Sequence, residues 1–193
     1  MTEGRFAYFD QPGLKPSIRP AATGDIEGMA RVSIDTWRLT YDGILPSGYL
    51  ERMRLTAHES QRRRLMNSPD TAHFVAEEPV TGETVAFASA GPSRGSAFGA
   101  SGEIYELYVQ NGFQGQGLGR TLAEAARLWL ADQGNEAMII WVLADNPARA
   151  FYEKMGGEAA GLRTIRVGGV LVDEAAYVWR GLKRPNQQKP LQH

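Results

Sequence analysis

The stretch "VQNGFQGQGLGRTLAEAARLWL" (residues 109–130) carries four glycines within eight residues and then changes directly to a helical pattern. Glycine loses more backbone freedom on folding than any other residue, so such a cluster is unfavourable unless the chain needs unusual dihedrals or a close approach to a ligand. Apolar residues then recur at helical spacing, at Leu118, Leu122, Ala125 and Trp129. The segment predicts a glycine-rich loop that opens a helix.

The segments on either side of this loop and helix are typical of strands. "EIYELYV" (103–109) precedes the loop, and "AMIIWVL" (137–143) follows the helix as a continuous apolar run. Such a run is expected of a strand that is buried on both faces. Farther out, strand patterns and helical patterns are interspersed, which predicts a mixed α/β sheet. We expect six or seven strands with helices on both faces, including a charged, exposed helix at "ESQRRRLMN" (59–67).

The composition limits the classes of protein to which the chain can belong. It has 193 residues, a formal net charge of −1, no cysteine and three separated histidines. We therefore expect no disulfide and no metal site. The near-neutral charge gives no reason to expect nucleic acid or a membrane surface as partner. No apolar run approaches the ~20 residues of a membrane-spanning helix. The N-terminus has no signal-peptide pattern, so we expect a cytoplasmic protein.

The distribution of glycine, proline and polar residues indicates one domain with a short segment at each end. Residues 1–16 contain two glycines and two prolines without a clear period, which predicts an N-terminal arm. Residues 17–181 hold all the helical and strand patterns. Residues 182–193 are polar, and we expect a disordered tail.

A strand, a glycine loop and a helix in this order present free backbone N–H groups to an anion. Two familiar phosphate patterns nevertheless fail. The dinucleotide pattern started at Gly115 requires glycine where the chain has Arg120, and the nucleoside-triphosphate pattern requires lysine where it has Leu118. The loop is therefore interpreted as an anion cradle of another type.

The remaining pattern, Gln114-x-x-Gly117-x-Gly119 after "LYV", resembles the signature of the GNAT superfamily of acyl-CoA-dependent N-acyltransferases. "NPARAFYEKMGG" (146–157) is similar to the second motif of that family, although Gly157 replaces the usual aromatic residue. "TWRLTYDGILPSGYLERM" (36–53) resembles the helices on its substrate side. The resemblance covers about residues 17–181 and implies a GNAT-like fold, in which strands 103–109 and 137–143 run parallel and splay apart.

The resemblance also implies that acetyl-CoA is the co-substrate and that the loop binds its pyrophosphate. Asn146 either caps the helix that follows it or hydrogen-bonds the pantetheine arm, and both roles stay open. The backbone N–H of Val109 is the candidate donor to the thioester oxygen. The residues expected to bind coenzyme A are Leu107, Tyr108, Val109, Gln114, Gly115, Gln116, Gly117, Leu118, Gly119, Arg120, Asn146 and Tyr152.

Acyl transfer to an amine requires a general base and benefits from a general acid. The family spacing, fourteen residues before Gly117, points to Glu103 as the base. In a regular strand Glu106 lies on the face opposite to Glu103. It is kept as the alternative base, because a β-bulge would reverse the alternation of side chains between the two faces. Tyr152 matches the family's acid; the alternative is that it packs in the core.

Trp37, Tyr41, Tyr49 and the loop "RGSAFGASG" (94–102) are expected to line the acceptor side, where aromatic faces attract an ammonium group. For Trp37 the alternative is a core position. The acceptor is predicted to be a small-molecule or protein amine, and a homodimer is left open. The prediction is thus an N-acetyltransferase that uses direct transfer in a ternary complex. The alternative is a catalytically silent acyl-CoA-binding sensor or scaffold.

Overall fold

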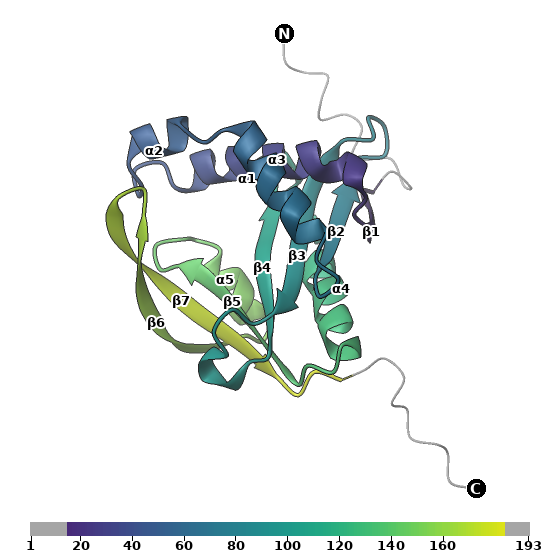
Figure 1. Ribbon diagram of the computed structural model, residues 1–193, viewed down its shortest axis with the longest axis vertical. Coiled ribbons are helices and arrows are strands. Elements are labelled where there is room, and N and C mark those ends of the chain that lie inside the picture. The colour runs from purple at the N-terminus through teal and green to yellow at the C-terminus, as the bar shows by residue number, and fades with distance from the viewer. Residues whose placement is uncertain (1–14, 184–193) are drawn as a thin grey trace, which may run out of the picture.

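The structure, a computed structural model, describes residues 15–183. The arm and the tail expected at the two ends fall almost wholly outside the described residues. Within them, seven strands form one sheet, as Figure 1 shows. In spatial order they are β1 (Ser17–Pro20), β2 (Ala72–Glu77), β3 (Thr84–Pro92), β4 (Gly102–Val109), β5 (Ala137–Leu143), β7 (Val170–Arg180) and β6 (Glu158–Val167).

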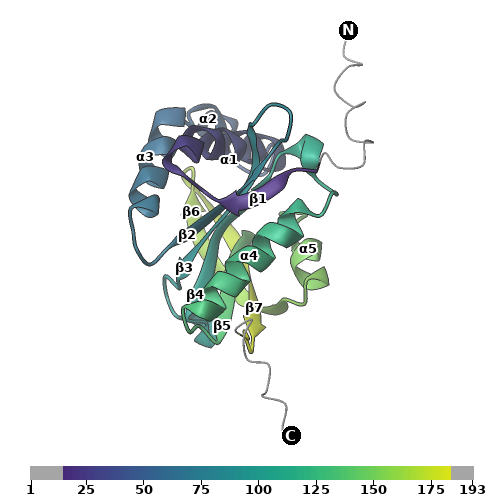
Figure 2. The same cartoon turned by 90° about the vertical axis from the view of Figure 1, so that its right-hand side faces the viewer.

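Helices cover both faces of this sheet (Figures 1 and 2). One face carries α1 (Ile26–Thr40), α2 (Ser47–Glu51) and α3 (Leu55–Met66), and the other carries α4 (Leu118–Asp132) and α5 (Arg149–Lys154). Met29 and Val32 of α1 pack against Phe87 of β3, whereas Leu118 and Leu122 of α4 pack against the opposite side of the same strand. The mixed sheet with helices on both faces is therefore confirmed.

Strands β4 and β5 are the only parallel neighbours in the described sheet, and they separate soon after they meet. Their pairing extends only from Gly102 to Ile104 on β4 and from Met138 to Ile140 on β5. Every other neighbouring pair is antiparallel. The expected splay is thus confirmed, and it leaves one edge of β4 without a strand partner from Tyr105 onward.

The free edge of β4 exposes backbone groups in a regular pattern. Gln110 donates its N–H to the carbonyl of Val85 on β3, at 2.9 Å. Because N–H groups alternate between the two edges of a strand, those of Leu107 and Val109 face away from β3. They therefore point into the gap between β4 and β5.

A β-bulge in β4 changes which side chains share a face. Ser89 is the register partner of Glu106, but the next residue, Ala90, is the partner of Ile104, so Tyr105 is the extra residue. A bulge of this kind inverts the alternation of side chains on the bulged strand.

The contacts on either side of the bulge show this inversion. Ile104 and Leu107, three residues apart, both pack in the core cluster that contains the α4 residues Ala126 and Leu130. Tyr108 packs with the α1 residues on the other face. Glu106 also faces that side, where α3 lies.

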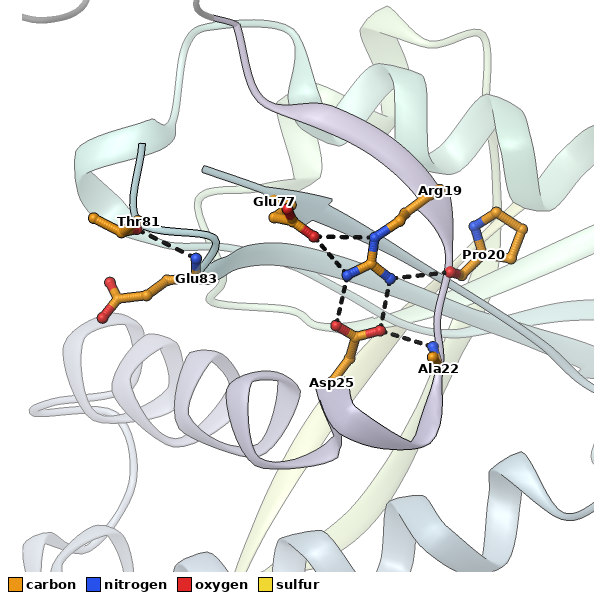
Figure 3. Close-up of polar contacts among 7 residues, drawn as sticks. All are labelled: Arg19, Pro20, Ala22, Asp25, Glu77, Thr81 and Glu83. Atoms are coloured by element: carbon orange, nitrogen blue, oxygen red, sulfur yellow. Dashed lines mark hydrogen bonds and ion pairs between the residues drawn. The ribbon is translucent and has the colours of Figure 1, made fainter. Parts of the chain in front are cut away.

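At the edge of the sheet, Arg19 joins β1 to β2 and to the start of α1 (Figure 3). Its Nε donates to Glu77 Oε2 at 3.0 Å, and its Nη1 and Nη2 donate to Asp25 at 2.7 and 2.9 Å. Asp25 Oδ2 also accepts the N–H of Ala22 at 2.7 Å. These hydrogen bonds, chiefly those from Arg19, lower the pKa of Asp25. The cluster ties the short edge strand to the helix that follows it.

Candidate active site

A cavity of about 1170 Å³ occupies the region where β4 and β5 part. It extends from the glycine loop at the end of β4 to α1 and α3 on the opposite face of the sheet. Glu103, Gln116 and Tyr49 are absent from its lining. The sequence-predicted residues that do line it are Trp37, Tyr41, Glu106, Leu107, Tyr108, Val109, Gln114, Gly115, Gly117, Leu118, Gly119, Arg120, Asn146 and Tyr152.

The glycine loop adopts a conformation that favours glycine at two positions. Gly115 has φ +74° and Gly117 has φ +86°, both in the left-handed region. The Gln114 side chain anchors the loop, because its Nε2 donates to the carbonyl of Val109 at 3.0 Å. A Cβ added at Gly117 would meet no protein atom within 4 Å, so this position borders open space.

The N-terminus of α4 has free donors and no internal acceptor for them. The first helical bond runs from the N–H of Thr121 to the carbonyl of Gly117, at 3.1 Å. The N–H groups of residues 118–120 therefore lack partners within the helix, and no side chain caps this end. The first turn holds Arg120 and no acidic residue. A cation at this end is unfavourable unless an anion lies nearby, so the cradle fits a pyrophosphate.

Gln116 lies apart from this cradle. Its Nε2 donates to the carbonyl of Gly112 at 3.3 Å, which supports the loop from outside the cavity.

The structure places Glu103 in a different role from the one expected for it. Its side chain is 2% exposed and lies outside the cavity lining. Oε1 accepts from Nε of Arg94 at 3.0 Å and from Nη2, and Oε2 accepts the backbone N–H of Arg94 at 2.8 Å. Both carboxylate oxygens are thus engaged with one arginine. This geometry favours the alternative base, Glu106, over Glu103, whose catalytic role stays a prediction.

The bulge instead brings Glu106 to the cavity. Its Oε1 accepts from Nη2 of Arg62 at 3.0 Å. Arg62 comes from α3, is 1% exposed, and lies with Cζ 4.8 Å from the centre of the Phe87 ring. The expectation of an exposed helix was wrong at this position, since α3 directs one arginine inward. Burial raises the pKa of Glu106, and the charge of Arg62 opposes that rise.

The ion pair of Arg62 with Glu106 leaves buried polar atoms unsatisfied. Among residues 15–183, three buried side-chain atoms have no hydrogen-bond partner: Thr36 Oγ1, Arg62 Nε and Glu106 Oε2. Thr36 and Glu106 line the cavity, and Arg62 is the partner of Glu106. Because buried polar groups in folded proteins are nearly always paired, this concentration indicates a site that binds a polar ligand.

Tyr152 enters the cavity from α5 on a rigid aromatic support. Its ring centre lies 5.3 Å from that of Phe151, 5.7 Å from Tyr177 and 6.4 Å from Trp179. The described part of the chain offers its hydroxyl no hydrogen-bond partner. Burial raises the pKa of Tyr152 well above that of an exposed tyrosine, so the phenol stays protonated.

Both the oxygen and the nitrogen of the Asn146 side-chain amide form hydrogen bonds within the protein. Oδ1 accepts the N–H of Ala148 at 2.8 Å, which supports the turn into α5. Nδ2 donates to the hydroxyl of Tyr41 at 2.8 Å. The oxygen thus holds the turn before α5 and does not cap the helix, whose N-cap is Ala148, while the amide nitrogen links this turn to the predicted acceptor side.

The acceptor side is smaller than the sequence predicted. Trp37 Nε1 donates to the hydroxyl of Tyr108 at 2.8 Å, and the Trp37 and Tyr41 rings meet edge to face at 4.9 Å. Tyr49 packs behind them against the β6–β7 turn, where its Cγ would lie 2.7 Å from a Cβ on Gly168. Of the loop 94–102, only Arg94 lines the cavity. Sequence reasoning included Arg94 only as part of this loop, and it missed Thr36 and Arg62, because nothing in their local pattern separates them from surface residues.

The comparisons with known proteins agree with this geometry. The profile described as "Acetyltransferase (GNAT) family" matches residues 28–157. The uncharacterised N-acetyltransferase YuaI of Bacillus subtilis is 32% identical over 167 residues, which is 86% of this chain and 94% of that protein. Two solved structures share the fold with high coverage. One is a ribosomal-protein-alanine N-acetyltransferase from Brucella melitensis (TM-score 0.65, 24% identity, 85% of this chain and 99% of that chain). The other is the PaiA N-acetyltransferase from Thermoplasma acidophilum in complex with coenzyme A (TM-score 0.62, 20% identity, 82% and 96%).

The chain belongs to the GNAT family of acetyltransferases. It is accordingly an acetyl-CoA-dependent N-acetyltransferase, and acts on an amine acceptor. Within residues 15–183, no helix has the length and apolar character needed to cross a membrane. In the same range, no three His, Cys, Asp or Glu side chains are grouped so as to hold a metal ion.

Proposed function

We propose that this enzyme transfers the acetyl group of acetyl-CoA directly to a primary amine while both substrates are bound. The observation that carries the proposal is the continuity of one cavity, which is lined by the glycine loop, by Tyr152 and by Glu106. Direct transfer needs the thioester, the amine, an acid and a base at one place.

The co-substrate supplies an activated thioester, and the chain offers three kinds of contact to hold it. The N–H groups at residues 117–120 and the Arg120 guanidinium are available to the pyrophosphate. The backbone of Leu107 and Val109 is available to the pantetheine amides, as an added strand would pair with a sheet edge. Asn146 lines the same cavity, and its Nδ2, which donates one hydrogen to Tyr41, has a second hydrogen for a pantetheine carbonyl. The Val109 N–H is available to the oxyanion that develops on the thioester carbonyl.

Glu106 is the proposed general base. An unperturbed alkylammonium has a pKa of about 10.4, so the amine must lose a proton before it attacks. The burial that raises the pKa of Glu106 makes its carboxylate a stronger base than an exposed one. Arg62 fixes the orientation of one oxygen and leaves Oε2 unpaired. Oε2 is the atom that accepts the proton.

Tyr152 is the proposed general acid. As the N–C bond forms and the C–S bond breaks, the sulfur takes the electron pair and gains negative charge. The Tyr152 hydroxyl, which has no partner among the described residues, donates its hydrogen to that sulfur. Its raised pKa keeps the phenol protonated across the working pH range.

The test is release of free thiol from acetyl-CoA over a panel of amines, with Glu106→Gln and Glu103→Gln as a matched pair. Removing the base should lower kcat/KM by roughly 10²- to 10⁴-fold. Wild-type kcat/KM should fall as pH drops through the raised pKa of Glu106, because the carboxylate form is the active one. Glu106→Gln should lose this acidic limb, whereas Glu103→Gln should retain it.

Two results would contradict the proposal. The reverse pattern, with the acidic limb lost only in Glu103→Gln, would return the role of base to Glu103. Absence of thiol release with every amine would refute direct amine acetylation.

A further inference from the structure

Arg94 stands at the end of the cavity that is opposite the glycine loop. Arg94 and Tyr105 both line the cavity, and Tyr105 is the first residue of β4 beyond its pairing with β5. Val109, where the glycine loop begins, is four residues farther along the strand. At a strand rise of about 3.3 Å per residue, the two ends are separated by about 13 Å. Arg94 therefore belongs to the acceptor end and is remote from the pyrophosphate cradle.

The Arg94 guanidinium is held in one orientation by a buried carboxylate and an aromatic ring. Nε and Nη2 donate to Oε1 of Glu103. Its Cζ lies 4.8 Å from the centre of the Tyr105 ring, and the Tyr105 hydroxyl is itself fixed by the carbonyl of Pro92 at 2.6 Å. Glu103 is 2% exposed, whereas Arg94 is 61% exposed. A buried carboxylate thus orients a guanidinium whose other edge is accessible.

That other edge retains hydrogen-bond donors. Nη1 makes no hydrogen bond to any of residues 15–183, while Nε and Nη2 are both engaged. Arginine pairs best with planar anions such as carboxylates, and an oriented guanidinium loses less freedom on binding. A stable surface pair would not require a fully buried glutamate beneath it. The arrangement is that of an arginine prepared to receive an anion.

The proposed base lies close to this arginine. The charge of Arg94 lowers the pKa of Glu106, against the larger effect of burial. Tyr105, on which Arg94 stacks, is the chain neighbour of Glu106. The remaining charged side chains that line this end are Arg64, Asp70 and Glu174, and Glu174 is engaged with Arg163. One small molecule can therefore present an ammonium group to Glu106 and an anion to Arg94.

We propose that the acceptor is a free amino acid, whose carboxylate is bound by Arg94 while its amine lies at Glu106. This inference rests on the proposed function, because it assigns the substrate class of the same site. A polyamine would meet the repulsion of the Arg94 cation, and an amine without an anion would leave the donors of Nη1 unpaired. Glu103 is the positioning residue for Arg94.

The experiment compares the standard L-amino acids with their carboxamides as acceptors, by thiol release from acetyl-CoA. Carboxamides keep the amine and the side chain but lose the negative charge. For the best amino acid, wild-type kcat/KM should exceed that of its amide at least tenfold. Arg94→Gln should lower this ratio at least tenfold, chiefly through KM of the amino acid. Arg94→Lys, which keeps the charge but loses the planar fork, should give an intermediate ratio.

Glu103→Gln tests the positioning role, and should lower the same ratio by a smaller factor with little change in kcat. Arg127→Gln is the matched control, since Arg127 pairs with Glu124 on α4 outside the cavity lining. It should leave the ratio unchanged. Thermal unfolding of each variant checks the fold.

Three outcomes would overturn the inference. In the first, wild-type enzyme acetylates amides as well as amino acids. In the second, Arg94→Gln and Arg94→Lys reduce both activities by the same factor. In the third, other amines are acetylated but no amino acid is, which would leave the proposed function standing. If no amine of any kind is acetylated, the proposed function fails together with the inference.

Discussion

Two arginine–carboxylate clusters, one at the edge of the sheet and one in the cavity, follow opposite physical rules. At the sheet edge, Arg19 is 39% exposed and its donors are all engaged by Asp25, Glu77 and a backbone carbonyl. In the cavity, Arg62 is 1% exposed, and the pair with Glu106 leaves Arg62 Nε and Glu106 Oε2 unpaired.

The pKa values of the two acids reflect this difference. Hydrogen bonding lowers the pKa of Asp25, whereas desolvation raises that of Glu106. The same side-chain chemistry therefore favours the ionised carboxylate at the edge and gives the cavity carboxylate the higher basicity that the proposed function requires. Variants in the cavity should change activity as well as stability, whereas variants at the edge should leave activity unchanged.

The largest expected effect within the cavity is that of Tyr152→Phe. The change removes the proton donor but keeps the ring that packs on Tyr177 and Trp179. Loss of a general acid lowers kcat by roughly 10²- to 10⁴-fold, while coenzyme A affinity and stability should change little. Since a thiol with a pKa of about 8.5 leaves readily at low pH, kcat should be measured above pH 8. If the variant kept the kcat of the wild type, Tyr152 would serve only in packing and would not be the general acid.

Arg62→Met should give the next largest effect. Breaking a buried ion pair by removing one partner typically costs about 3–5 kcal/mol. Without the cation, the pKa of Glu106 should rise further, so the acidic limb of kcat/KM should move to higher pH. The loss of stability should be greatest at high pH, where the lone carboxylate is ionised, and smaller as pH falls and it is protonated. Urea unfolding at several pH values measures this effect.

The double variant Arg62→Met/Glu106→Leu separates the two functions of this pair. An apolar replacement of both partners is often neutral or stabilising, so the double variant should regain the unfolding free energy lost by Arg62→Met. It should nevertheless stay inactive, because the base is gone. An active double variant would show that the cavity pair, like the edge cluster, serves only stability.

Gly117→Val tests the opposite end of the cavity. The branched side chain would occupy the open space beside the free N–H groups of α4 and would also have to adopt φ +86°. Coenzyme A should bind more than tenfold more weakly, as measured by calorimetry, because the backbone can no longer approach the pyrophosphate. Gly112→Val is the matched control, since Gly112 has open space around it and no positive φ. Equal affinities in the two variants would argue against the cradle.

A feature of the fold or of the site could be predicted from the sequence where it depends on residues that are close together in the chain. The glycine loop, α4 and the strands beside them could be predicted from the residues that form them. The separation of β4 from β5 was predicted only from the resemblance to the GNAT family. The choice between Glu103 and Glu106 could not be made from the sequence, because the bulge at Tyr105 depends on the register of β4 with Ser89 of β3. Regular alternation put Glu106 and Glu103 on opposite faces, and one extra residue reversed the phase after it.

The burial of Arg62 could not be predicted from the local sequence pattern either. Three consecutive arginines on a polar helix indicate a solvated face, and for Arg63 and Arg64 the structure agrees to a large extent. Only the placement of α3 over the strand that carries Glu106 supplies the carboxylate that makes burial tolerable. The orientation of Arg94 likewise depends on a contact outside its own loop, with Glu103 on β4.

The smallest expected effect is that of Asp25→Asn at the sheet edge. The folded-state pKa of Asp25 lies below its usual value of 3.8, so its ionised form adds stability above about pH 4, which is lost as pH falls through the folded value. Because Arg19 is partly exposed, the loss at pH 7 should not exceed ~1 kcal/mol. Asparagine keeps an acceptor for the N–H of Ala22, which reduces the loss further. Urea unfolding should show a smaller difference between variant and wild type at pH 3 than at pH 7, with kcat/KM unchanged at both. Glu27→Gln, in the exposed pair with Arg31, is the control and should show no difference at either pH. If Asp25→Asn shifted the acidic limb of kcat/KM as Arg62→Met is expected to do, the division between a structural edge and a cavity that determines activity would not hold.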